Sequence, residues 1–248
     1  MKMDLSREEF VKFLWDSWRA VSPCDVKALR KTQFDTEEII RLRELMGHLP
    51  QSTGYLEDRT QLRRNIYNQL IEGDVTRDRQ AVLVCGLPAS GKSGVAEMIR
   101  LKLNARIIDS DLAKEHFPEF NGGKFAQMVH EESDQIRNEV LEECWDRGEN
   151  IILPIVGKSY ESVFSLYNGL RGNEYDVHLR FLSCDPKESA RRVVERYKTS
   201  GRFVDPLYAL NVSDKPMQVF SSLCGLAWKS RRLLRQDEID AYLIEEGF

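Results

Sequence analysis

The stretch VLVCGLPASGKSGVA, residues 82–96, decides the fold of this chain. Its second half fits the pattern G-x-x-x-x-G-K-[ST], in which four positions have a defined residue type. An apolar run precedes the pattern and a helical pattern begins at Ser93, which is the strand–loop–helix order of a phosphate-binding loop. We therefore predict that nucleotide phosphates are bound by eight consecutive residues: Gly86, Leu87, Pro88, Ala89, Ser90, Gly91, Lys92 and Ser93.

Each defined position of the loop has a chemical role. Gly86 and Gly91 permit a close approach of the backbone to a phosphate, so that successive N–H groups point at it. Lys92 is predicted to bring a point charge to the β- and γ-phosphate oxygens, and the hydroxyl of Ser93 to ligate Mg²⁺. The loop thus predicts ATP and Mg²⁺ as cofactors, with Ser93 as the metal ligand from the protein.

The composition excludes several classes of partner. The 248-residue chain has a formal net charge of −4, which gives no general attraction to nucleic acid or to an anionic membrane. The longest apolar runs, AVLVC and IILPIV, fall far short of the roughly 20 residues of a membrane helix. The start, MKMDLSREEF, has acidic residues where a secretory signal has an apolar core. We expect a cytoplasmic protein with neither membrane nor nucleic acid as a partner.

The pattern of apolar residues changes near residue 75. The first part reads as helical, with a capping box at SREE, residues 6–9, and a break at GHLPQSTG, residues 47–54. A third helix is predicted over about residues 57–72. We expect a helical N-terminal extension over residues 1–54, followed by one domain over residues 55–248.

After residue 80, predicted strands and helices alternate. The strands are AVLVC, ARIID, NIILPIV and YDVHLRFLSC, and each is followed by a helical pattern. Such alternation predicts an α/β fold with a mainly parallel sheet flanked by helices, as in P-loop NTPases and kinases. Residues 216–248 are interpreted as further helix.

Two carboxylates follow the second predicted strand, in ARIIDSDLAKEHF, residues 105–117. No guanine-reading N-K-x-D segment is present, and IILPIV does not end in an acidic residue. Because strand ends beside a phosphate loop open into the ligand crevice, Asp111 is placed to accept a proton from an attacking hydroxyl. For Asp109 we favour a helix cap or a solvated acid.

Cations gather in ARRVVERYKTSGRFVDP, residues 190–206. The turn KTSGR directly after a helix is typical of a lid that closes over a transferring phosphoryl group. We predict that Arg196 and Arg202 are lid residues that neutralise phosphate charge. Arg191 and Arg192 are interpreted as surface charges.

In this order, the phosphate loop, IIDSDLAKEHFPEF, HEES and ERYKTSGRFV resemble the zeta-toxin family of P-loop kinases over about residues 57–212. Studied members of that family phosphorylate UDP-N-acetylglucosamine. The resemblance implies that Asp111 is the base that activates the acceptor hydroxyl. It also implies that Arg196 and Arg202 clamp the phosphates.

One motif departs from the family. Its third strand commonly ends in an acidic residue and a hydroxyl residue that contact the sugar nucleotide, and here that place reads PIVGKS, residues 154–159. Pro154 and Val156 stand where the acid and the hydroxyl would be, while Gly157, Lys158 and Ser159 continue the pattern. The change removes two polar groups from the expected acceptor pocket, and Pro154 is expected to bend the strand end out of register.

The leading hypothesis is an ATP-dependent kinase that transfers the γ-phosphate to a hydroxyl of a small molecule, for which a nucleotide sugar is one candidate. The alternatives are a kinase for an unrelated acceptor, such as an antibiotic, another metabolite or a nucleic-acid end, and a nucleotide-binding regulatory module without transfer. Zeta-like kinases are often restrained by a helical antitoxin. Two further hypotheses are therefore an antitoxin partner and intramolecular inhibition by the N-terminal helices, whose Trp15 and Trp18 are expected to be exposed. The alternative for these helices, which we favour for so short a segment, is a simple packing role.

Overall fold

The computed structural model describes residues 59–123, 125–235, 238–239 and 241–242. They form two compact units, and each unit collects segments from separate parts of the chain. We call the first the sheet unit; its described residues fall within 73–109, 140–192 and 208–242. We call the second the helical unit; its described residues fall within 59–72, 110–139 and 193–207.

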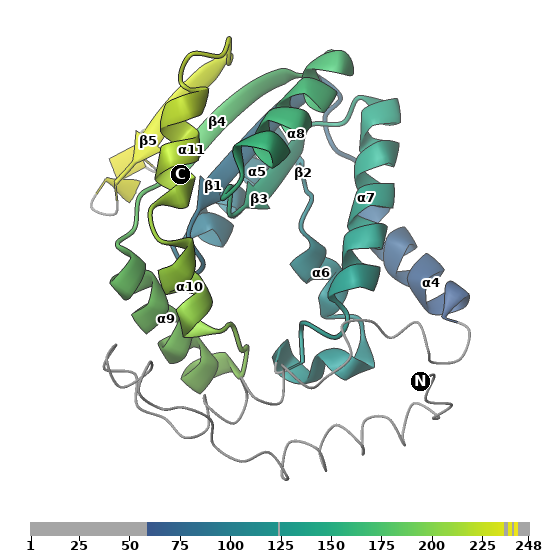
Figure 1. The fold of residues 1–248 in the computed structure, drawn as a ribbon. Coiled ribbons are helices and arrows are strands. Elements are labelled where there is room, and N and C mark those ends of the chain that lie inside the picture. The colour runs from purple at the N-terminus through teal and green to yellow at the C-terminus, as the bar shows by residue number, and fades with distance from the viewer. Residues whose placement is uncertain (1–58, 124, 236–237, 240, 243–248) are drawn as a thin grey trace. The chain divides into compact units, whose positions relative to one another are not determined.

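The sheet unit is built on five parallel strands in the order β2-β3-β1-β4-β5 (Figure 1). Their bounds are β1 Gln80–Gly86, β2 Arg106–Ile107, β3 Ile151–Ile155, β4 Asp176–Leu182 and β5 Ser230–Leu234. Because all strands are parallel, their carboxyl ends lie at one edge of the sheet. The central strand β1 therefore delivers the phosphate loop to the middle of that edge.

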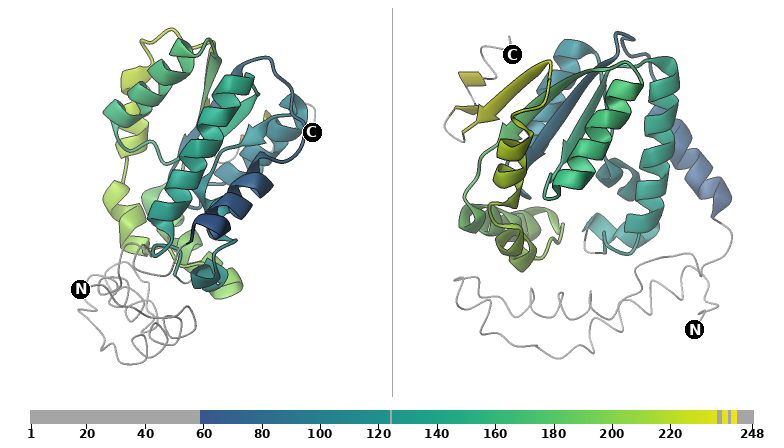
Figure 2. Two further views of the ribbon diagram at one scale, coloured as in Figure 1. Left: turned by 90° about the vertical axis from the view of Figure 1, so that its right-hand side faces the viewer. Right: turned by 45° about the horizontal axis from the view of Figure 1, so that its top comes forward.

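Helices cover both faces of this sheet. Strand β1 is buried from Ala81 to Gly86, as expected for a strand without a solvent face. Helix α5, Lys92–Leu103, packs on one face together with Ile239 and Tyr242. Helices α8, Tyr160–Gly172, and α11, Lys215–Leu223, contact each other and cover the other face (Figure 2).

The helical unit consists of short segments. It contains the helix α4, Thr60–Ile71, and the helix α6, Ser110–Lys114, which contact each other. It also contains the 3-10 helix η1, Pro118–Gly123. It also contains the first part of α7, His130–Arg147, and the last part of α9, Pro186–Ser200. The remaining helix, α10, spans Pro206–Val212.

The alternation of strands and helices predicted after residue 80 is confirmed, with three corrections. Strand β2 ends at Ile107, so Asp111 lies in the first turn of α6 rather than at a strand end. Pro154 does not shift the register, because it pairs with Val84 and the next pair, Cys85 with Ile155, follows in step. The tail is not all helix, since β5 pairs with β4 as a parallel edge strand.

The prediction of a helical extension over residues 1–54, with its boundary and both tryptophans, lies outside the described residues. Among the helices that are described, none has the length and apolarity to cross a membrane.

Candidate nucleotide-binding and phosphoryl-transfer site

The phosphate loop joins β1 to α5 through a tightly packed turn. A Cβ built on Gly86 would lie 2.8 Å from the Ser90 Oγ and 2.9 Å from the Leu182 carbonyl oxygen, so a larger residue does not fit there. Gly91 caps α5 with a φ of 99°, in the left-handed region that glycine adopts without strain. The two glycines of the sequence pattern are therefore required by the geometry of the loop.

The loop presents positive charge at the start of a helix. Lys92 is the first residue of α5, and its Nζ donates hydrogen bonds to the carbonyl oxygens of Gly86 at 3.0 Å and Leu87 at 2.7 Å. The N-terminus of α5 adds the partial positive charge of the helix dipole. Ser93, in the first turn, is exposed. A cationic side chain, a helix N-terminus and an exposed hydroxyl thus lie together at this end of α5, and a hydroxyl oxygen is a ligand that suits Mg²⁺ when phosphate oxygens and water complete its shell.

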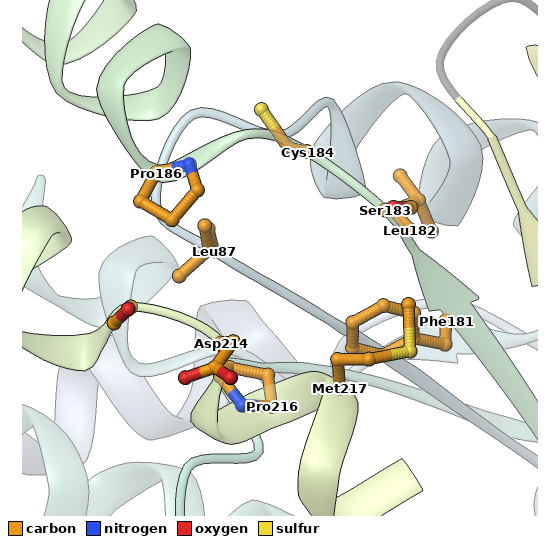
Figure 3. Close-up of a pocket in the computed structure, with 10 residues that line it drawn as sticks. Leu87, Phe181, Leu182, Ser183, Cys184, Pro186, Asp214, Pro216 and Met217 are labelled. Atoms are coloured by element: carbon orange, nitrogen blue, oxygen red, sulfur yellow. The ribbon is translucent and has the colours of Figure 1, made fainter. Parts of the chain in front are cut away.

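Other contacts in the sheet unit support the loop. The buried Ser189 of α9 donates a hydrogen bond from its Oγ to the Pro88 carbonyl oxygen at 2.6 Å. The Leu87 side chain lies among the residues that line a cavity of about 180 Å³ (Figure 3). The lining residues are Leu87, Phe181, Leu182, Ser183, Cys184, Pro186, Ser213, Asp214, Pro216 and Met217. Sequence reasoning missed Ser189, whose only signal is a small polar residue on a buried face of a helix.

The candidate base lies in the helical unit within a cluster of cations. The Asp111 carboxylate forms an ion pair with the Arg202 guanidinium and another with the Lys114 Nζ, the latter at 3.0 Å. Burial alone would raise the pKa of Asp111, but the two cations outweigh it and lower the pKa below its ordinary value. The carboxylate is therefore ionised at neutral pH. Lys114 was not predicted, although its position three residues after Asp111 on one helix was a signal.

Arg196 contributes a second guanidinium to the same unit. Its Nε is buried and makes no hydrogen bond within the part of the chain that the structure describes. Burial, and then the like charge of Arg202, lower the pKa of Arg196, while the Asp111 carboxylate acts in the opposite direction. A half-buried cation with a buried, unused Nε donor is suited to an anionic ligand such as a phosphate.

The predicted site residues thus form two groups. The eight residues of the phosphate loop are contiguous in the sheet unit, while Asp111, Arg196 and Arg202 interact within the helical unit. Arg191, interpreted as a surface charge, forms an ion pair with Glu188 at 2.7 Å, and Arg192 contacts the same carboxylate. The role of each residue in catalysis stays a prediction.

The strand end that departs from the family pattern carries few polar groups. Pro154 and Val156 are half-buried at the carboxyl end of β3. The Ser159 Oγ caps α8 by accepting a hydrogen bond from the Ser162 N–H at 3.2 Å, and it donates another to Glu161 at 2.9 Å. Lys158 is exposed, with its Nζ 5.0 Å from the centre of the Tyr208 ring. Ser159 is thus engaged in capping α8, whereas the Lys158 side chain lies exposed beside Tyr208.

The sequence matches the family model described as Zeta toxin over residues 71–225, which is more than half of the chain. No curated protein matches the sequence. Among solved structures, one from the PezAT chromosomal toxin-antitoxin system of Streptococcus pneumoniae is similar with a TM-score of 0.57 and 15% identity, over 71% of this chain and 77% of that chain. Another, AvrRxo1-ORF1:-ORF2 with ATP, has a TM-score of 0.54 and 15% identity, over 71% of this chain and 61% of that chain. These likenesses agree with the fold described above, and the family match identifies the chain as a member of the zeta-toxin family.

Proposed function

We propose that the protein transfers the γ-phosphate of ATP to a hydroxyl group of a small molecule. Membership of the zeta-toxin family makes it a P-loop kinase, an ATP-dependent phosphotransferase. The observation that carries the transfer proposal is the Asp111 carboxylate, which Lys114 and Arg202 hold ionised in the unit that also contains Arg196, whose buried Nε makes no hydrogen bond among the described residues.

The proposed roles follow from charge. Lys92 and the N–H groups of the loop bind the β- and γ-phosphates, and Arg196 and Arg202 neutralise the charge of the transferring group. The Ser93 hydroxyl would help to hold Mg²⁺, which would supply further neutralisation of the phosphate charge. The side chains of Lys92, Ser93, Arg196 and Arg202 are also proposed to orient the phosphoryl group for in-line attack.

The proton is assigned to Asp111. The oxygen of the acceptor hydroxyl forms a bond to the γ-phosphorus while the bond from that phosphorus to the bridging oxygen of ADP breaks. The hydroxyl proton passes to the Asp111 carboxylate, which the neighbouring cations keep ionised and ready to accept it. Acceptor-dependent release of ADP tests this reaction. If the wild-type protein binds ATP but a metabolite mixture does not accelerate ADP release, the protein is a binding module and the proposal is wrong.

The acceptor is proposed to differ from UDP-N-acetylglucosamine. Pro154 and Val156 leave polar atoms of that sugar nucleotide without partners at the end of β3, and each unpaired buried polar group costs about 1–3 kcal/mol. Two such losses lower its use by roughly 10²- to 10⁴-fold. We therefore propose an acceptor with an apolar or smaller face toward Val156.

Restoring the family's polar groups tests this part of the proposal. The double variant Pro154→Glu/Val156→Thr is expected to phosphorylate UDP-N-acetylglucosamine faster than the wild-type protein. The matched control Pro154→Ala/Val156→Ala enlarges the same wall without polar atoms and is expected to gain nothing. Wild-type phosphorylation of UDP-N-acetylglucosamine at the rate of a dedicated kinase would refute this part of the proposal and would mean that other side chains, with Lys158 and Ser159 as candidates, replace the lost contacts.

A protein partner is also proposed. The two structural neighbours come from a toxin-antitoxin system and from an ORF1:ORF2 complex, which supports an antitoxin-like partner for this chain. The alternative is restraint by the protein's own residues 1–54.

A further inference from the structure

We propose that Arg59 is a positioning residue for phosphoryl transfer, because it locks η1, against which the backbone of Arg202 packs. The inference rests on the proposed function, since it concerns the efficiency of that transfer. Arg59 precedes α4 and lies outside residues 71–225, which match the family model. Neither the family match nor the sequence motifs point to it.

Arg59 is the centre of a buried ion-pair network. It is 7% exposed, and its two partners, Glu119 and Glu132, are 0% and 3% exposed. Its guanidinium donates to both carboxylate oxygens of Glu119, at 2.7 and 3.2 Å, and its Nε donates to Glu132 at 3.0 Å. Its guanidinium also lies over the Phe117 ring, 5.1 Å from the ring centre. The fork of the guanidinium satisfies two carboxylates at once, which an ammonium group does not do with the same geometry.

Glu119 belongs to η1, and the other end of η1 contacts the loop that carries Arg202. The Phe203 N–H donates a hydrogen bond to the Gly123 carbonyl oxygen at 3.2 Å. A Cβ built on Gly123 would lie 2.6 Å from the Arg202 Cα, and Gly123 has a φ of +98°. The backbone of Arg202 therefore rests directly on the last residue of η1.

The final contact leads to the candidate base. Arg202 forms the ion pair with Asp111 that holds this carboxylate in place. Within the helical unit, Arg59 is thus linked to Asp111 in three steps: the ion pair with Glu119, the short helix η1 that joins Glu119 to Gly123, and the contact of Gly123 with Arg202, whose guanidinium pairs with Asp111. If Arg59 lost its guanidinium, one cation could no longer hydrogen-bond both buried carboxylates with the same geometry. Glu119, and with it η1, would then be able to shift. A displacement of about 1 Å at a reacting group lowers a rate by as much as about 10²-fold.

Arg59→Lys is the test variant, because it keeps the positive charge and removes the pair of hydrogen bonds to the two Glu119 oxygens. We expect the maximal rate of acceptor-stimulated ADP release to fall roughly 10- to 10²-fold, with the KM for ATP unchanged. Arg63→Lys is the matched control: Arg63 contacts Glu132 at 2.9 Å, is more exposed, and makes no hydrogen bond or ion pair with η1 among the residues that the structure describes. It is expected to keep the wild-type rate.

A double-variant cycle separates positioning from mere stability. In an Arg202→Ala background, Arg59→Lys is expected to lower the rate no further, because its effect passes through Arg202. Gly123→Ala, which disturbs the contact with Arg202 and leaves the groups of the Arg59 ion pairs in place, is expected to show the same non-additive pattern and serves if Arg59→Lys does not fold. A wild-type rate in Arg59→Lys, or an undiminished loss in the Arg202→Ala background, would overturn the inference. A wild-type protein without acceptor-stimulated turnover would instead sink the proposed function.

Discussion

Replacing Arg196 by methionine is expected to stabilise the protein and to remove most of its transfer activity. The Arg196 Nε is buried without a hydrogen bond among the described residues, and the charge of Arg202 opposes the charge of Arg196. An unsatisfied buried polar group costs about 1–3 kcal/mol, and methionine removes this cost while keeping most of the side-chain length. At about 2–4 °C per kcal/mol for a protein of this size, the Tm of the nucleotide-free protein should rise by about 2–12 °C.

The same substitution removes a proposed phosphate ligand. An arginine that stabilises a transferring phosphoryl group contributes about 10³- to 10⁵-fold to kcat, so transfer should fall by an amount in that range. Thermal unfolding followed by fluorescence gives the Tm, and transfer of label from γ-labelled ATP to a metabolite extract gives the rate. Arg191→Met on the same helix is the matched control. It breaks a surface ion pair with Glu188, worth about 0–1 kcal/mol, and should keep the transfer rate.

Two results would refute this reasoning about Arg196. A lower Tm in Arg196→Met would mean that the guanidinium stabilises the folded protein through contacts other than those described. A wild-type transfer rate in the same variant would mean that Arg196 does not act on a phosphate.

Three further predictions concern the loop, the base and the N-terminal residues. Lys92→Ala is expected to weaken ATP binding about 10- to 10²-fold, as the loss of a charged hydrogen-bond donor predicts; wild-type affinity in a calorimetric titration would contradict the loop assignment. Asp111→Asn is expected to keep ATP affinity and to lower transfer about 10²- to 10⁴-fold. Because the pKa of Asp111 is lowered in the folded state, its contribution to stability is present above the pKa of the unfolded chain and is lost as the pH falls through the folded pKa. The Tm difference between wild-type and Asp111→Asn protein should therefore shrink in acid, and a constant difference would argue against the ion pairs. Deletion of residues 1–54 is expected to raise ATP turnover if these residues restrain the site; insoluble protein without a gain in turnover would favour a packing role.

The features that sequence could predict are local ones. The phosphate loop is encoded within eight consecutive residues. Gly86 is required there because a Cβ would clash with neighbouring atoms, and Gly91 is required because its φ is positive. The strands of the sheet centre were also predictable, since β1 is buried on both faces and reads as one apolar run. Family resemblance added roles for Asp111, Arg196 and Arg202, and these roles still await measurement.

The features that sequence could not predict depend on distant contacts or weak patterns. Strand β5 lies at an edge of the sheet and carries Arg231 and Arg232. Charged side chains on an edge strand disfavour pairing with another chain, and they also interrupt the apolar pattern by which a strand is predicted. Arg59 and Glu119 are 60 residues apart in sequence, and Asp111 and Arg202 are 91 apart. No periodicity or motif links such pairs, so the network behind the candidate base becomes visible only in the fold.

A single-turnover experiment with γ-labelled ATP and a metabolite extract tests the central claim most directly. With wild-type protein in excess over ATP, we predict that the label moves to a phosphate ester of an organic compound. In Lys92→Ala and Asp111→Asn the label should remain in ATP over the same time. Label that appears only as inorganic phosphate, at one rate with and without the extract, would contradict the claim that this protein is a kinase for a hydroxyl acceptor.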